Sequence, residues 1–471
     1  MEVALLSQVV RMLFFTFVVI SGLLLVGTVI RAKVKLMQKL FLPASVIGGF
    51  VGLLLGPIVL KDYAILPIPQ DWLSLASLLP GLLIVPVVAA VPLGLAMNEK
   101  NIDGTKKNKG ATNNVIIMLL ILVAINSIQN VFSLSLAGVF EKFFNYDFYP
   151  TFGTELSAGF AGGHGTAGVV GSLLQSLGQP YWEVAQGVTT TTATFGLIGG
   201  LLVGIVLINF AARKGYTNFL TTGADLPEEM KTGIQKDLKK QGHAGLESTN
   251  SSSIDSLALH LALILGVSGL SFTLTFLFKK YNVLVLNMIP EWAYAIILMY
   301  IVWGLMVKMK LDWVVDNKTK GKITSTLADY AIVAAIMSLP IKAVLTYLVP
   351  LLVTMAGALA LTVAAAYFLC KWLFGDYWFE RSMPILGTNT GVFLTGLLLL
   401  KMVDPDLKSP VLRDYSLSYS FNSVIGFILI PLLFGLLINQ GLLAGIGLYT
   451  GTLIVSAIGL LIYGRRERKR A

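Results

Sequence analysis

Long apolar stretches, separated by short polar segments, recur along nearly the whole chain of 471 residues. A helix needs about 20 consecutive apolar residues to cross the hydrocarbon core of a bilayer. Stretches of this kind predict an all-α membrane protein with about 11 transmembrane helices. The expected spans are 12–30, 40–60, 73–97, 114–140, 185–210, 256–279, 290–308, 326–349, 351–373, 414–438 and 442–463.

Two further apolar stretches, residues 152–178 and 383–402, are interrupted by glycine and lie between predicted spans. The first holds the cluster 162–168, in which four glycines surround His164. Each glycine in a helix interior is less favourable than alanine by about 1 kcal/mol, so this cluster is a poor spanning helix. Irregular backbone is tolerated at membrane depth only where it is buried in protein or lines a cavity. We therefore expect two re-entrant loops.

The main hydrophilic segment, residues 213–255, divides the apolar part of the chain into two halves of five spans each. An odd number of crossings starts the second half on the opposite side of the membrane, so we expect an inverted repeat. Paired glycine-interrupted segments in corresponding positions indicate the binding site of a transporter. The expected parts are an N-terminal membrane half over 1–212, a cytoplasmic linker over 213–255, a C-terminal membrane half over 256–440, and an additional helix with a basic tail over 441–471.

Composition supports the membrane assignment and excludes several other classes of protein. The chain is 55% hydrophobic and 13% charged, with a mean hydropathy of +0.78, whereas soluble domains carry about 25% charged residues. A single cysteine, Cys370, rules out an intramolecular disulfide, and the few histidines lack the spacing of metal ligands. No motif pairs a nucleophile with a base. We therefore expect no enzyme activity, no cofactor, no resident metal and no nucleic-acid partner.

Lysine and arginine gather in short loops, and such loops stay on the cytoplasmic side of a membrane. The net charge of +10 is concentrated there and in the tail. The clusters lie at 31–39, 100–109, 213–214, 308–322 and 465–470. One topology places all of them inside, with the N-terminus outside and both the central linker and the C-terminus in the cytoplasm. Lys279 and Lys280 are the main exception, because this topology puts them outside.

The two glycine-interrupted stretches have the chemistry of a site for an anion and a cation together. Glycine lets backbone groups approach a ligand closely. The N-terminal end of a half-helix favours a carboxylate, whereas freed carbonyls and side-chain oxygens suit a hard cation such as Na⁺. The predicted substrate-binding residues are Gly162, Gly163, His164, Gly165, Thr166, Thr388, Asn389, Thr390 and Gly391. The predicted ion-binding or cavity-lining residues are Asn126, Asn130, Thr189, Thr190, Asn422 and Ser423.

Several of these patterns have a structural alternative. The glycines at 48, 52 and 56 and at 196, 200 and 204 are spaced for close helix packing. Residues 126, 129 and 130 share one helix face, and either join helices through hydrogen bonds or line the cavity. His164 either takes a direct part as ligand or proton carrier, or only makes a hydrogen bond. We expect Asp329 at the membrane interface, and Glu155 and Arg413 in solvent beside the two loops.

Three motifs carry a resemblance to a known family. They are GGHGTA at 162–167, TG at 390–391 followed by LLLKMVDPD at 398–406, and LPASVIGG at 42–49. With them the chain resembles the bacterial sodium:glutamate symporters over essentially its whole length. Membership implies two inverted halves of five spans, re-entrant loops that enter from opposite faces, a homodimer and elevator-type alternating access. The sequence departs from the family pattern in the second loop, which lacks paired glycines, and in its additional C-terminal span.

The resemblance implies a multi-pass transporter of the plasma membrane, the inner membrane of a bacterial cell. Na⁺ would be the coupling ion, and the transported partner would be L-glutamate or a related acidic amino acid. The alternative is Na⁺- or H⁺-coupled transport of another small di- or tricarboxylate, which would share every feature above. A channel is a more remote alternative, because the sequence lacks a repeated short filter.

Overall fold

The computed structural model describes residues 2–40, 42–94, 109–219, 232–250, 252–281, 291–404 and 408–468. Within these ranges the chain is helical and contains no β-strand. Ten segments are long and apolar enough to cross a membrane. They are α1 (Glu2–Lys33), α3 (Ala44–Leu55) with α4 (Pro57–Leu60), α5 (Gln70–Ala89), α6 (Lys109–Phe144), α8 (Trp182–Lys214), α10 (Ser256–Lys280), α11 (Glu291–Lys308), α14 (Leu348–Leu373), α17 (Val411–Gln440) and α18 (Leu442–Arg468).

Ten of the predicted spans coincide with these helices, and the exception is the span expected over 326–349. There α12 (Asn317–Met337) ends and the short α13 (Ile341–Thr346) follows. Pro340 lies between them, and a proline has no backbone N–H and disfavours helical backbone at the residue before it, here Leu339. The prediction of one continuous span from 326 to 349 is therefore wrong.

Both glycine-interrupted stretches fold into helices that are broken. The first stretch is α7 (Thr154–Ser176), whose backbone leaves helical geometry at Gly163. The second stretch contains α15 (Trp378–Thr390) and α16 (Phe393–Val403), which are joined through Gly391 and Val392. The irregular backbone that the glycines predict is therefore present in both places.

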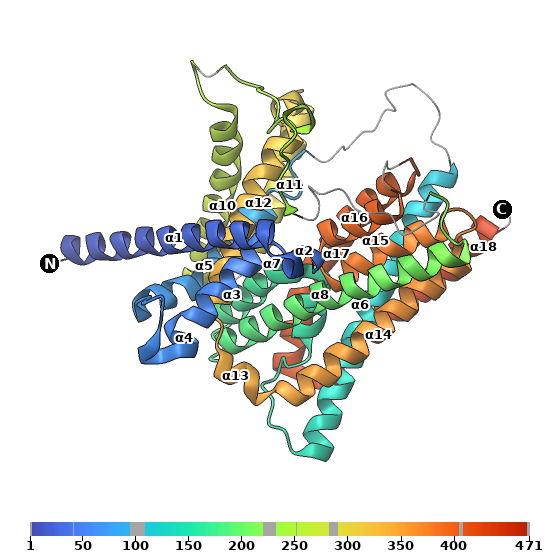
Figure 1. The fold of residues 1–471 in the computed structure, drawn as a ribbon, viewed down its shortest axis with the longest axis horizontal. Helices are drawn as coiled ribbons and strands as arrows, with labels where there is room; N and C mark the ends of the chain where they lie inside the picture. Colours follow the sequence, from blue (N-terminus) through green and yellow to red (C-terminus); the bar gives the residue numbers. More distant parts are fainter. Residues whose placement is uncertain are drawn as a thin grey trace.

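The long helices fall into two groups (Figure 1), each with apolar clusters of its own, and a further cluster that includes Val46, Leu197 and Met355 joins them. The first helix group comprises α1, α3, α5, α10, α11 and α12, with Leu79 of α5 in one cluster with Met337 of α12 and Val85 of α5 in another with Trp292 of α11. The second helix group comprises α6, α8 and α14 to α18, and shares a core that includes Ile121 and Leu399. Each half of the sequence contributes helices to both groups, so neither group belongs to one half.

Small residues let helices approach closely at two places that matter for the site. A Cβ on Gly48 of α3 would clash with the carbonyl oxygen of Leu23 in α1. A Cβ on Gly200 of α8 would clash with Oγ1 of Thr390, the last residue of α15. Both glycines therefore have the packing role expected of their spacing. The second contact shows that the end of α15 packs closely against α8.

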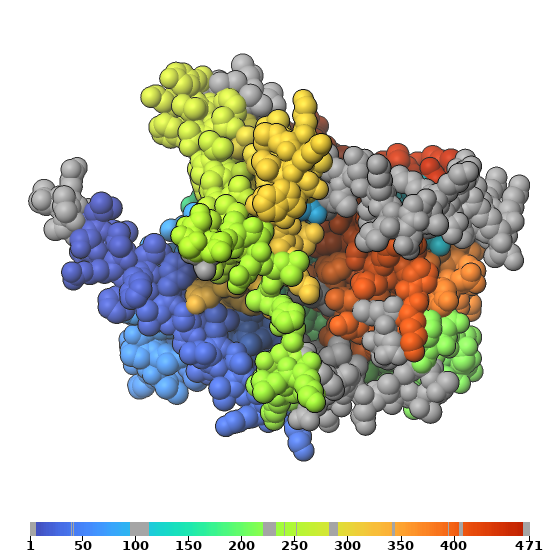
Figure 2. Space-filling model, turned by 90° about the horizontal axis from the view of Figure 1, so that it is seen from above, coloured from blue at the N-terminus to red at the C-terminus, as the bar shows by residue number. Residues whose placement is uncertain are grey.

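The described part of the central linker, residues 232–250 and 252–255, crosses one face of the molecule (Figure 2). Before it, the backbone and side-chain nitrogens of Asn218 donate to the Glu380 carboxylate of α15, at 2.6 and 3.0 Å. Further along, Gly245 lies against Thr319 and Asp316, which caps α12. The segment between the halves thus contacts both helix groups. The predicted basic cluster at 100–108 and linker residues 220–231 lie outside the described residues.

Candidate functional site

The break in α7 is at Gly163, whose φ of 62° and ψ of −158° are strongly unfavourable for a residue with a side chain. A Cβ on this residue would also lie 2.6 Å from Cγ1 of Val392, well inside van der Waals contact. Two independent constraints, backbone conformation and close approach, therefore demand glycine here.

The chain reverses its direction along α8 at this break. Before Gly163, α7 and α8 advance in the same direction, and after Gly163 they run in opposite directions. The neighbouring pairs are Glu155 with Thr192 and Phe160 with Gly196 before the break, and His164 with Thr194 and Gly171 with Gln186 after it. Residues 154–176 are therefore a helical hairpin, which we call the first hairpin.

Residues 378–403, comprising α15 and α16, form a second hairpin. Its two arms touch, because a Cβ on Gly387 would lie 2.7 Å from Cα of Gly396. The Tyr415 hydroxyl of α17 lies 2.6 Å from Oγ1 of Thr388 on one arm, and donates to the carbonyl of Phe393 on the other arm at 2.9 Å. One buried tyrosine therefore ties the two arms together.

The tips of the two hairpins meet, although they are far apart in sequence. A Cβ on Gly163 would lie beside Val392, as noted, and 3.7 Å from the carbonyl oxygen of Gly391. A Cβ on Gly196 of α8 would lie 2.6 Å from the carbonyl oxygen of Thr390 and 2.8 Å from the ring of Phe160. Helix α8 thus holds both tips at the same level.

A cavity of about 750 Å³ lies beside the two tips. The second hairpin contributes Val392, Phe393 and Thr395 to its lining, in place of the residues that the sequence singled out. The predicted residues that the cavity brings together are Gly162, Gly163, His164, Gly165, Thr166, Asn126, Asn422 and Ser423. Two helices, α6 and α17, and two hairpin tips that are distant in sequence therefore line one cavity.

The other predicted residues are not part of this lining, and all of them except Gly391 make hydrogen bonds to neighbouring groups. They are Asn130, Thr189, Thr190, Thr388, Asn389, Thr390 and Gly391. The Thr190 hydroxyl donates to a carbonyl of the preceding turn of α8 at 2.9 Å, and the Asn389 amide does the same within α15 at 2.9 Å. The amide oxygen of Asn130 accepts from Ser157 of the first hairpin at 2.7 Å. These bonds position the residues that line the cavity.

His164 makes a defined hydrogen bond as well as lining the cavity. Its side chain is 5% exposed, and Nε2 lies 2.9 Å from Oγ1 of Thr194 in α8. The Thr194 hydroxyl already donates to the carbonyl of Thr190 at 2.9 Å, so it accepts from the imidazole. His164 therefore donates through Nε2, and this bond fixes the tip of the first hairpin on α8.

In the sequence, Gln129 stands out only as part of a polar helix face, whereas in the structure its side chain connects three elements. Its side-chain nitrogen donates to the Asn389 carbonyl and to the Thr362 hydroxyl, both at 2.8 Å. These two bonds join α6, α14 and the second hairpin. The spacing of Gln129 from Asn126 and Asn130 was the available signal, because all three share one face of α6.

A buried ion pair at the base of the second hairpin has no signal in the sequence. Arg381 of α15 lies 2.9 Å from the carboxylate of Asp414 in α17, and both side chains are almost wholly buried. The neighbouring Arg413 also contacts Asp414, at 2.9 Å, while 56% of its side chain is exposed. Arg413 is thus in solvent as expected, whereas the Arg381 pair depends on tertiary contact alone.

One expectation about an acidic residue, that Glu155 lies in solvent, is wrong. Glu155, expected in solvent, is 1% exposed, and its carboxylate accepts from the backbone N–H of Gly153 at 2.9 Å. The carboxylate belongs to the turn that begins the first hairpin. Asp329, expected at the membrane interface, lines the cavity. Helix α12 begins at Asn317, nine residues before the expected start of its span at 326, so Asp329 lies near the middle of this helix, and its place at the membrane interface stays a prediction.

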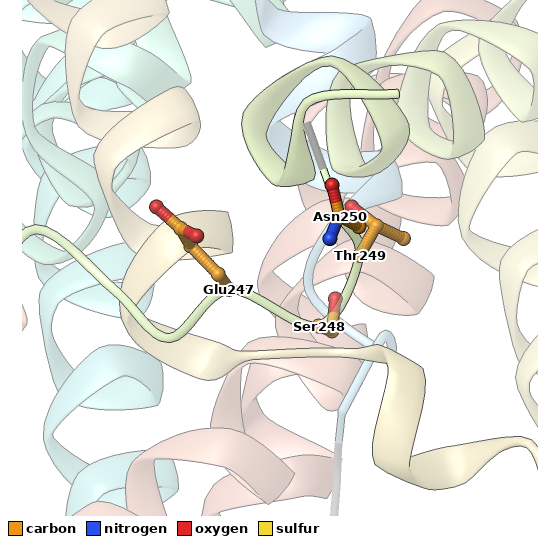
Figure 3. A pocket seen from close by; sticks show the side chains of 4 residues that line it. All are labelled: Glu247, Ser248, Thr249 and Asn250. Carbon is orange, nitrogen blue, oxygen red and sulfur yellow. The ribbon is translucent and has the colours of Figure 1, made fainter. Parts of the chain in front are cut away.

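A second hollow lies in the central linker and has no comparable chemistry (Figure 3). It is lined by four consecutive residues, 247–250, on one stretch of loop. Thr249 is bonded to Ser256, through its backbone N–H at 3.1 Å and its hydroxyl at 2.9 Å. These bonds hold the loop against the first residue of α10. The cavity at the hairpin tips is therefore the better candidate for a binding site.

Comparison with known proteins agrees with this architecture. The chain matches the sodium/glutamate symporter family over residues 12–378, a range that includes the first hairpin and ends where α15 begins. No curated protein matches the chain. The family match covers most of the sequence, and ten apolar helices make it a multi-pass membrane protein. The chain therefore belongs to the sodium/glutamate symporter family.

Proposed function

We propose that this chain is a secondary active transporter that couples Na⁺ influx to the uptake of L-glutamate. Membership of the sodium/glutamate symporter family supports the class of substrate and the coupling ion. The observation that carries the proposal is the meeting of two broken helices, at Gly163 and Val392, on the wall of one cavity. Discontinuous helices that meet in this way form the substrate and ion sites of many secondary transporters.

The first hairpin supplies the part of the site that binds carboxylate. Its second arm begins directly after Gly163, and the free amides at the start of a helix carry about half an elementary positive charge. Glycines on both sides of the break leave these amides uncovered, so a carboxylate reaches them without displacing a side chain. The residues assigned to substrate binding are Gly162, Gly163, His164, Gly165 and Thr166, with Thr388, Asn389, Thr390 and Gly391 completing the site from the second hairpin.

Oxygen atoms around the tips supply ligands for Na⁺, which as a hard cation prefers carbonyl, amide and hydroxyl oxygens. The residues assigned to this role are Asn126, Asn130, Thr189, Thr190, Asn422 and Ser423. Asn126, Asn422 and Ser423 line the cavity and are the direct candidates. Asn130 and the two threonines are not part of its lining, and we infer that they hold the direct ligands in place.

We infer that both hairpins are re-entrant and enter from opposite faces as parts of an inverted repeat. The distribution of helices supports this: α1, α3 and α5 join the first helix group as α10, α11 and α12 do, and α6 and α8 join the second group as α14 and α17 do. Movement of the second group along the first would expose the cavity to either side. Such an elevator, working in a homodimer, is the mechanism we propose.

The proposed location is the plasma membrane, with the N-terminus outside and the central linker and C-terminus in the cytoplasm. The basic clusters at 31–39, 213–214, 308–322 and 465–470 support this orientation, since such loops stay inside. A cysteine introduced into the central linker, for example at Ser252, should react with a membrane-impermeant thiol reagent only in inside-out vesicles. Labelling from the outside would reverse the topology.

Transport by purified protein in liposomes tests the function itself. Uptake of labelled L-glutamate should require an inward Na⁺ gradient and should collapse when K⁺ replaces Na⁺ outside. Uptake driven equally well by a proton gradient without Na⁺ would reject the coupling ion. Uptake of citrate or succinate in preference to glutamate would reject the substrate, and would favour the alternative of a di- or tricarboxylate transporter.

A further inference from the structure

One wall of the cavity is built by the first helix group. It is formed where the end of α1, the start of α3 and the middle of α12 come together. The polar residues of this wall are Arg31, Ser45, Thr324, Ser325 and Asp329. Hydroxyl, carboxylate and guanidinium groups from three helices therefore line the same cavity as the glycine backbone of the first hairpin.

Asp329 is the one carboxylate among the described residues that line the cavity. Its side chain is exposed to this space, near the middle of α12 (Asn317–Met337). Arg31 shares the wall, yet among the described residues no cation forms an ion pair with Asp329, since these pairs involve Lys279, Arg381 and Arg413. An ionisable residue within a membrane protein, without a partner of its own, indicates a cationic ligand.

We propose that Asp329 binds the α-ammonium group of the transported amino acid, and so selects an amino acid over a dicarboxylate of the same length. This inference rests on the proposed function, because it concerns the substrate of the same cavity. The hairpin tips offer backbone amides to the carboxylates, and Asp329 offers a negative charge to the same cavity from α12. A substrate without the ammonium group would leave Asp329 facing a carboxylate with no cation between them.

The surroundings of Asp329 suit an ammonium group better than a second Na⁺. An ammonium group has three N–H donors, which a carboxylate and neighbouring hydroxyls can accept. The Ser45 hydroxyl faces the Asp329 carboxylate, and Ser325 lines the same wall one turn away. Helix α12 is regular at this point, so its carbonyls are bonded within the helix and offer no free oxygen to an ion. Ion sites of transporters use unwound backbone instead.

This arrangement makes selectivity a matter of repulsion as well as attraction. A protein can select one ligand over another through favourable contacts to the selected ligand. It can do so as strongly by placing an unpaired charge where it repels the rejected ligand. L-Glutamate and glutarate differ only in the ammonium group, so the pair isolates the contribution of Asp329. A hydrogen bond to a charged group has a net effect of about 1.5–3 kcal/mol, which corresponds to a difference in affinity of about 10- to 150-fold.

The test is a thermal-shift titration of purified protein with L-glutamate and glutarate in Na⁺ buffer, because a ligand of the native state raises its stability according to its Kd. The wild type should bind L-glutamate at least about 10-fold more tightly than glutarate. In Asp329→Asn, glutamate affinity should fall by that factor while glutarate affinity stays the same or rises. Asp312→Asn, which removes an exposed acid that does not line the cavity, should change neither.

Each of the following results would overturn the proposal. In the wild type, equal affinity for the two ligands would do so even if Asp329→Asn failed to fold. In the variant, an equal loss for both ligands would show a general structural effect. A raised Na⁺ concentration for half-maximal shift, with the ratio of the two affinities unchanged, would assign Asp329 to the ion. Tighter wild-type binding of glutarate would remove this assignment and leave a Na⁺-dependent carboxylate transporter, whereas binding of neither ligand would remove the proposed function as well.

Discussion

The two hairpins have the same shape but differ in what surrounds their tips. The first hairpin is bare at its tip, where glycines flank the break at Gly163 and residues 162–166 all line the cavity. The second hairpin is tied down, with Thr388 bonded to Tyr415 and the Asn389 carbonyl bonded to Gln129. The comparison shows that uncovered backbone and rigid support come from different elements, so damage to each should have a different signature.

The largest effect on uptake is expected from Gly163→Ala, which alters the uncovered tip of the first hairpin. The substitution adds a methyl group 2.6 Å from Val392 and strains a backbone with φ of 62°. A displacement of the site by about 1 Å can reduce activity by about 100-fold, and we expect a loss of this size in Na⁺-driven glutamate uptake.

Gly178→Ala is the matched control for the bare tip. Gly178 also has a positive φ, of 67°, but a Cβ there meets nothing within 4 Å. Uptake per folded molecule should stay within about two-fold of the wild type, since only backbone strain of about 1–2 kcal/mol is added. Equal loss of uptake in the two variants would mean that the contact between the tips has no special role.

The second largest effect is expected from Tyr415→Phe, which loosens the tied hairpin. Loss of the hydroxyl leaves Thr388 and the carbonyl of Phe393 without their partner, and each unsatisfied buried group destabilises by about 1–3 kcal/mol. We expect a lower unfolding temperature together with slower uptake, at unchanged Na⁺ dependence. Tyr63→Phe removes a hydroxyl from a residue that is 88% exposed, and should alter neither quantity.

A smaller effect is expected from Gln129→Met, which cuts the connection of α6 to the second hairpin. The change removes two donors at nearly constant volume, and leaves the Asn389 carbonyl unpaired. A net effect of about 1 kcal/mol corresponds to an uptake reduced by about five-fold. If glutamate affinity fell while stability stayed constant, Gln129 would contact the substrate and the second hairpin would be more than a support.

The smallest effect is expected from His164→Gln at the bare tip. Glutamine can still donate to Thr194, so the bond that fixes the tip is preserved. Uptake should stay within about three-fold, in line with a neutral hydrogen bond worth about 1 kcal/mol. A loss comparable to that of Gly163→Ala would show that the imidazole acts directly on substrate or proton.

The sequence predicted the spanning helices well, because the bilayer enforces long apolar runs whatever the tertiary structure. It failed over 326–349, where Pro340 should have divided the span. The breaks at Gly163 and Gly391 were visible as glycine-interrupted stretches, and the positive φ at Gly163 is one that few other residues suit. The reversal of the chain along α8 was not visible, because the direction of a helix depends on its neighbours and not on its composition.

The candidate site was predicted in part. The residues of the first hairpin line the cavity as expected, whereas residues 388–391 are not part of its lining. A motif locates a loop in the sequence but does not say which side of that loop faces a cavity. The same limit applies to the buried pair of Arg381 and Asp414, whose partners are 33 positions apart, and to Asp329, whose place in its helix depended on where α12 begins.

The shared composition of the two helix groups has a consequence for biogenesis. Because each group takes helices from both halves of the sequence, the core of the first group cannot close until α12 has left the ribosome, and that of the second group until α18 has done so. The N-terminal helices must wait in the bilayer with their inner faces uncovered, and a chain truncated at the central linker has no complete core to fold around. Neither half should fold or transport alone. Co-expression of the two halves as separate polypeptides should therefore restore folding and transport, because the cores form when the helices assemble and do not require one continuous chain.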